Sequence, residues 1–144
     1  MIKDFKYYLE SQLAKRASVD FEEAKALMKK SEGRLSFSIK TREINDNTAP
    51  YIFEDIYECL REASQSLMSL RGYKPYSHEA LIAFLKEFFA FSLSDISALD
   101  RYRMLRNKTV YSGEKITSAT CKEAFEFLLS FLPKLKAEFE KLSK

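Results

Sequence analysis

The scarcity of glycine and proline is the feature that most constrains this fold, because the 144 residues contain only three of each. Typical chains carry about 7% glycine and 5% proline. Many-stranded β-sandwiches need these residues at their turns, and phosphate-binding loops need glycine. The composition therefore excludes both, and it favours a chain made of long helices joined by few tight turns.

Apolar residues recur at spacings of three and four, which predicts amphipathic helices along the whole chain. Local signals set the boundaries: Asp20 and Glu23 form a capping box, Pro50 suits a first helical turn, and Gly72 suits a helix end. Expected helix starts are an amphipathic segment from Ile2, then Asp20, Tyr51, Ser77, Ser94 and Thr117. Residues 72–76 are a tight connection, and Pro133 is expected to kink or break the last helix. We therefore expect an all-α, up-and-down antiparallel bundle of about five to six helices, forming one domain over residues 1–144.

Charge and cysteine content exclude several classes of protein. The net charge is +3, which permits an anionic partner without identifying one. The longest uncharged run, residues 63–70, is far shorter than the roughly 20 residues of a membrane helix. The N-terminus lacks the apolar core of a signal peptide, so we expect a cytoplasmic protein with no membrane association. Cys59 and Cys121 have no neighbouring ligands, so we expect buried thiols, no metal and no cofactor.

Two groups of polar residues are expected to be structural. The only histidine, His78, follows the expected cap Ser77 and is interpreted as a capping or packing residue. Four acidic residues follow one side of the helix that starts at Tyr51, and no facing helix carries matching acids for a two-metal site. We interpret them as a solvated face: Glu54, Asp55, Glu58 and Glu62.

The segment from Arg101 to Tyr111 is the strongest candidate for binding an anion. It holds four basic residues within eight positions and no acidic residue among them. Helical geometry puts Arg103, Arg106 and Asn107 on one side, with Tyr111 close to the direction of Asn107. Guanidinium groups match phosphate, and a tyrosine ring stacks on bases. The alternative is an exposed basic helix face without a ligand.

Three blocks of this sequence resemble the HEPN family, the higher-eukaryote and prokaryote nucleotide-binding helical bundles. The first block is Phe21–Ala24 continuing through Leu35 and Ile39, the second is Ala63–Leu85, and the third is Leu99–Tyr111. The resemblance covers roughly residues 20 to 140. It implies a HEPN-like bundle that binds a nucleotide or RNA, with the contacts coming from Arg103, Arg106, Asn107, Lys108 and Tyr111.

The resemblance also bears on catalysis. Active relatives cleave RNA without a metal, using an arginine, a polar residue after it and a histidine four to six residues further on. Arg106 and Asn107 match the first two, whereas Tyr111 occupies the histidine position. A phenol with a pKa near 10 is a poor base at neutral pH. We therefore expect binding without cleavage; the alternatives are a ribonuclease that uses Arg106, Asn107 and Tyr111, and a purely structural interaction bundle.

Expectations about partners come mainly from the same resemblance. Such proteins are usually dimers and often accompany a minimal nucleotidyltransferase, as in toxin–antitoxin pairs. Some relatives are adenylylated on a tyrosine near the motif, for which Tyr111 is the nearest candidate here. A homodimer is also favoured by a wide apolar face that exceeds the needs of one bundle core: Leu81, Phe84, Leu85, Phe88, Phe89 and Phe91.

Overall fold

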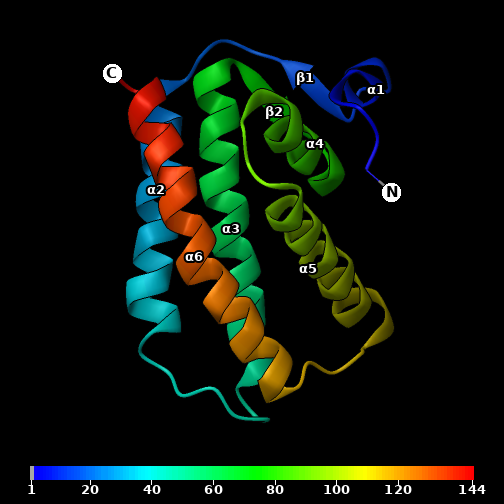
Figure 1. The fold of residues 1–144 in the computed structure, drawn as a ribbon, viewed down its shortest axis with the longest axis vertical. Helices are drawn as coiled ribbons and strands as arrows, with labels where there is room; N and C mark the ends of the chain where they lie inside the picture. The colour runs from blue at the N-terminus through cyan, green and yellow to red at the C-terminus, as the bar shows by residue number, and fades with distance from the viewer. Residues whose placement is uncertain (1) are drawn as a thin grey trace.

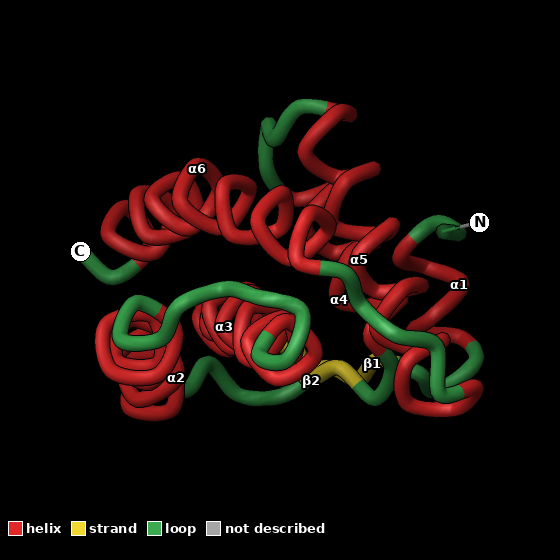
Figure 2. Tube along the Cα trace, turned by 90° about the horizontal axis from the view of Figure 1, so that it is seen from below, coloured by secondary structure: helices red, strands yellow, loops and turns green. Residues whose placement is uncertain are grey.

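The computed structural model describes residues 2–144, which form an all-α helical bundle with one small two-stranded sheet. The central helix α3 (Ala49–Arg71) packs against α2 (Phe21–Gly33) and against α6 (Ser118–Leu142). On the other side of α3 from α2 lie α4 (His78–Phe88), α5 (Leu93–Ser112) and the short α1 (Phe5–Glu10) (Figure 1). The view from below shows the same division, with α3 at the centre (Figure 2).

The directions of the helices follow from the lengths of their connections. A short loop joins α2 to α3, and these two helices run antiparallel (Figure 1). α6 runs in the same direction as α3, because α5 returns the chain to the end of the bundle at which α3 begins, and α6 starts from there (Figure 1). Thus the bundle of five to six helices is confirmed, while the alternation of direction does not extend to the packed pair α3 and α6.

The predicted start of α2 is confirmed, since Asp20 Oδ1 accepts a hydrogen bond of 2.9 Å from Glu23 N. Beyond Gly33 the helix continues as a π-helical segment, η1 (Arg34–Ile39). Most π-helical turns are short insertions in α-helices and often lie at functional sites. Here the wider turn presents Arg34 to α3, where it bonds two carboxylates.

α3 is the central helix, and nearly every residue of its predicted apolar stripe is buried. It begins at Ala49, with Pro50 in its first turn as predicted. It ends at Gly72, whose φ of 80° lies in the left-handed region. A Cβ there would be 2.9 Å from Ala17 O, so only glycine fits this junction.

The structure contains a two-stranded antiparallel element that was not predicted. We name it the hairpin, although helices α2 and α3 rather than a turn join its two strands. Strand β1 (Ala14–Arg16) pairs antiparallel with β2 (Tyr73–Pro75), so Lys15 lies opposite Lys74. No strand was expected after the amphipathic start of the chain, and residues 72–76 were expected to form only a tight connection. The pairing escaped prediction because the two strands have three residues each and are far apart in the chain.

The wide apolar face of α4 is covered within the chain. Leu81, Phe84 and Leu85 are buried, and the three remaining phenylalanines pack against the core. The Phe84 ring lies 5.7 Å from that of Phe5, and the Phe91 ring lies 5.1 Å from that of Phe131. The face is therefore not in excess of the core, and the homodimer stays a prediction that rests on the family resemblance alone.

The ends predicted for the last two helices lie close to the observed ones. Ser92 Oγ caps α5 by accepting from Asp95 N at 3.0 Å, and Gly113 ends it with a φ of 66°. α6 passes through Pro133 without a break.

Cys59 and Cys121 are buried free thiols, as predicted, and burial raises the pKa of each to about 11. Among residues 2–144, no helix is long and apolar enough to cross a membrane.

Candidate functional site

The basic segment, Arg101 to Tyr111, lies mainly on the second half of α5. Every buried residue of this helix precedes the segment's centre, the last being Tyr102 and Arg103. Beyond them the helix has no buried side chain up to Ser112. The first half of α5 therefore anchors it to the bundle, and the second half carries the basic residues towards the surface.

The three arginines of α5 differ in their partners. Arg101 bonds Glu123 at 2.6 Å. Arg103 is only 7% exposed, and its guanidinium bonds Asp100 at 2.7 Å with Glu79 at 3.7 Å. Arg106 is half-buried, and within residues 2–144 no carboxylate lies within ion-pair distance of it. Of the three, it is the arginine whose charge is free for a ligand.

The guanidinium of Arg106 lies over the ring of Tyr57, a buried residue of α3, at 5.9 Å from the ring centroid. The hydroxyl of the same tyrosine is 2.7 Å from His78 Nδ1, and the two rings are nearly parallel. Three helices thus contribute one side chain each. The tyrosine bonds the imidazole through its hydroxyl and contacts the guanidinium through its ring.

The electrostatics of this trio favour a neutral imidazole and a protonated phenol. Burial, followed by the charges of Arg106 and Arg61, lowers the pKa of His78. Burial raises the pKa of Tyr57, against the nearby arginine charges. Both side chains are therefore uncharged at neutral pH, and the positive charge of the trio resides on Arg106.

Arg61, one turn after Tyr57 on α3, completes the site. It donates to Glu58 Oε2 at 2.8 and 3.0 Å and to Gln65 at 2.8 Å. Burial alone would raise the pKa of Glu58, but Arg61, with help from Arg106 and Arg34, lowers it. Beside Arg61 is a hollow of about 230 Å³ whose rim includes Ser77 and His78.

The remaining predicted site residues are spread along the exposed half of α5. Asn107 is half-buried, Lys108 is exposed, and Tyr111 is 81% exposed. Within the described chain, no hydrogen bond or ring contact joins Tyr111 to Arg106 or Asn107. The structure therefore groups Arg106 with Tyr57 and His78 rather than with Tyr111.

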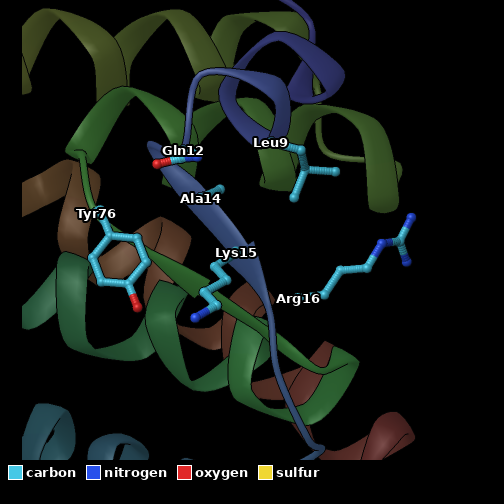
Figure 3. Close-up of a pocket in the computed structure, with 6 residues that line it drawn as sticks. All are labelled: Leu9, Gln12, Ala14, Lys15, Arg16 and Tyr76. Carbon is cyan, nitrogen blue, oxygen red and sulfur yellow. The ribbon is translucent and has the colours of Figure 1, made fainter.

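A larger hollow lies elsewhere, against the hairpin. It has a volume of about 690 Å³ and is lined by residues of α1, β1 and the segment after β2 (Figure 3). None of the predicted α5 residues lines it. Its rim carries Lys15, Arg16 and the exposed ring of Tyr76.

The prediction of a solvated acidic face on α3 is wrong for Glu62. Its side chain is 1% exposed and receives two hydrogen bonds from Arg34, at 3.0 and 3.1 Å. Arg34 also bonds Asp55, which is partly buried, whereas Glu54 is exposed as predicted. The error arose because the arginine that neutralises these acids comes from a distant π-helical turn. In the described part of the chain no group of acidic, histidine or cysteine side chains is arranged to hold a metal.

Tyr57 and His78 are the residues of this site that sequence reasoning missed. Tyr57 lies within the apolar stripe of α3, where an aromatic residue indicates only core packing. His78 follows a helix cap and was interpreted as structural. One signal was available for His78, which lies in the Ala63–Leu85 block of the family resemblance, whereas Tyr57 lies outside all three blocks.

Comparison of the chain with family models, with curated proteins and with solved structures gave no match in any of the three.

Proposed function

We propose that the chain is a HEPN-like module that binds a nucleotide or RNA through a phosphate contact at Arg106. The observation that carries this proposal is the half-buried guanidinium with no carboxylate partner among residues 2–144. Burying a charge without a partner is costly, and a bound phosphate would compensate it. The arginines before it on α5 are already neutralised by acids of the same chain.

The surroundings of Arg106 support a phosphate rather than a carboxylate-bearing protein side chain. A phosphate has several acceptor oxygens, and the site offers several donors: the guanidinium, the imidazole and the amide of Asn107. Lys108, exposed and without an ion pair among residues 2–144, adds a positive charge to the same helix. Arg103 contributes indirectly. It pairs with Asp100 of its own helix, and its ion pair with Glu79 holds the adjacent turn of α5 against α4.

A second candidate function, metal-independent RNA cleavage, is favoured by one observation, the neutral imidazole of His78 close to Arg106. In this reaction the ribose 2′-oxygen attacks phosphorus, the 5′-oxygen leaves, and a 2′,3′-cyclic phosphate forms. His78 would accept the 2′-hydroxyl proton, water would protonate the leaving oxygen, and Arg106 would stabilise the charge on phosphorus. This version replaces Tyr111 with His78 as the base.

The exposed end of α5 supports the proposals of a partner protein. Met104 and Val110 are each 46% exposed and Tyr111 is 81% exposed. Exposed apolar side chains beside basic residues suit a second copy of the chain or a nucleotidyltransferase. Tyr111 is also open to adenylylation, which mass spectrometry after co-expression with such an enzyme would detect.

Binding of a short labelled RNA, followed by fluorescence anisotropy at several salt concentrations, tests the main proposal. We expect Arg106→Gln to weaken binding by about 10-fold or more, the value of one charge-assisted hydrogen bond. Arg101→Gln is the matched control, because it removes the same charge from the same helix but from a residue held by Glu123. Equal losses in both variants would show general electrostatic attraction and contradict a specific site.

Incubation with RNA and analysis for 2′,3′-cyclic phosphate ends separates the two functions. The binding proposal expects no product. Product that His78→Gln abolishes while Tyr111→Phe leaves it unchanged would establish the second candidate. If Tyr111→Phe abolished the product instead, the alternative drawn from the family resemblance, in which Tyr111 is catalytic, would be supported.

A further inference from the structure

Two hollows of the surface meet at one side chain, Tyr76. The smaller hollow, beside Arg61 and His78, includes Tyr76 in its wall. The larger one, against the hairpin, includes the same tyrosine together with Lys15 (Figure 3). Since the ring is 60% exposed, it forms a shared and accessible boundary between the two hollows. The smaller hollow therefore adjoins the Arg106–Tyr57–His78 trio through His78, and it adjoins the hairpin surface through Tyr76.

The hairpin surface carries an unusual pair of charges. Lys15 and Lys74 are directly opposite each other in the antiparallel pairing. Both are exposed, and within residues 2–144 neither has a carboxylate within ion-pair distance. Residues directly opposite have side chains on the same face, and like charges placed there destabilise a sheet. An anion bound across the pair would remove this repulsion.

Tyr76 lies on that same face of the hairpin. It follows Lys74 by two residues in the extended segment, a spacing that returns a side chain to the same side of a strand. The hydrogen bond of 2.8 Å from Tyr76 N to Leu13 O continues the pairing to this residue. Figure 3 shows Lys15 and Tyr76 on one side of the hairpin, with Arg16 directed to the other.

We propose that the ligand is a single-stranded nucleic acid, which runs from Arg106 past His78, over Tyr76 and on to the Lys15–Lys74 pair. This inference rests on the proposed function and specifies its substrate class. Positive charges at both ends bind successive phosphates, and the exposed tyrosine ring between them stacks on a base. A base already paired in a duplex does not present its face to Tyr76, and a mononucleotide has no second sugar–phosphate unit to place at the lysine pair.

The experiment measures the affinity of 3′-labelled oligouridylates, from the dinucleotide to about 16 nucleotides, the upper site size of single-strand-binding domains. We expect affinity to rise with length and then level off. The double variant Lys15→Gln/Lys74→Gln should lose this gain, and its dependence of log K on log salt should be shallower by about 1.4. Binding of the dinucleotide should be unchanged in this variant.

Tyr76→Ala tests the stacking step separately. Loss of one base–aromatic contact should weaken the longer oligomers by roughly 5- to 100-fold and leave the dinucleotide unaffected. Lys29→Gln/Lys40→Gln is the matched control, because it removes two exposed lysines from α2 and the end of η1, across α3 from the hairpin. All the substituted lysines are exposed, so thermal unfolding should confirm that the variants stay folded.

The outcomes separate this inference from the proposed function. Binding that depends on Arg106 but not on oligomer length or on the hairpin lysines would overturn the single-stranded path and keep the phosphate site. Equal losses in the hairpin variant and the control, or equal affinity for duplex RNA, would also overturn the path. If no oligomer binds and Arg106→Gln has no effect, both proposals fail.

Discussion

Arg34 and Arg106 both approach the central helix α3, from opposite sides, and they illustrate two uses of the same residue type. Arg34 meets Glu62 and Asp55, and the hydrogen bond to Glu62, outweighing burial, raises its pKa. Arg106 meets the face of Tyr57 and, within the described residues, no acid. On the side of α3 that Arg34 approaches, which we name the closed side, acidic residues of the same chain neutralise the arginine. On the side that Arg106 approaches, which we name the open side, the positive charge stays available for a ligand.

The largest expected effect comes from breaking the closed side. Arg34→Met leaves the carboxylate of Glu62 buried with only Lys30, at 3.6 Å, as a partner. Removing one member of a buried pair costs about 3–5 kcal/mol, and we expect the lower end because Arg34 is itself 22% exposed. Guanidinium unfolding followed by circular dichroism measures the loss.

Arg106→Met is the matched control for that prediction. Because Arg106 is half-buried without an acidic partner among residues 2–144, its removal should lower the free energy of unfolding by no more than about 0.5 kcal/mol and can raise it. Similar losses in both variants would remove the distinction between the two arginines and make Arg106 a structural residue.

A smaller effect is expected from Tyr57→Phe, which keeps the ring beneath Arg106 but removes the hydroxyl that bonds His78 at 2.7 Å. Loss of one hydrogen bond should cost about 1 kcal/mol of stability. His78 is the only histidine, so its imidazole signals in an NMR spectrum report directly on this contact. Unchanged signals in the variant would argue that the contact is absent in solution.

The pH dependence of His78 tests the electrostatics of the open side. Its pKa in the folded chain is below the usual value of about 6.5, so the unfolded chain takes up a proton more readily. Stability should therefore decrease as pH falls below about 6.5, and His78→Gln should lessen this decrease.

A bound phosphate should act in the opposite direction on the same group. It favours the imidazolium form, so RNA affinity should increase as pH falls through the pKa of His78. An NMR titration with and without ligand would detect the upward shift. Arg106→Gln should also raise this pKa, because it removes a neighbouring positive charge.

The smallest expected effect is at Arg101, whose ion pair with Glu123 is on the surface, with both side chains more than half exposed. Breaking such a pair changes stability by less than about 1 kcal/mol. Thermal unfolding of Arg101→Gln at low and high salt would check this, and a larger loss would show that the pair anchors α5 to α6.

Local signals in the sequence were sufficient for most of the helices. Asp20, Ser77 and Gly72 predicted helix ends correctly, because capping depends on residues within one turn. The apolar spacing along α3 predicted its buried face for the same reason. Features that depend on distant residues were missed, including the β1–β2 pairing and the burial of Glu62 by Arg34.

The candidate site was predictable only in part. Arg106 was found because basic residues cluster along α5. The neighbours that define its surroundings, Tyr57 and His78, come from two other helices, and nothing in the order of residues joins them. Arg103 shows the converse: it carries the same charge as Arg106, but Asp100 and Glu79 take up its guanidinium in the fold.

The end of the central helix α3 and the position of the hairpin depend on the same residue, Gly72. Any side chain at this position would clash with Ala17 O. A mutation of Gly72 would therefore displace the segment that carries Lys15, although the two are far apart in sequence. Lineages that keep the hairpin in place are expected to keep this glycine, whereas Arg106 is free to be retained or lost independently. A related chain that has replaced Gly72 is therefore the natural place to look for phosphate recognition that has been separated from the hairpin.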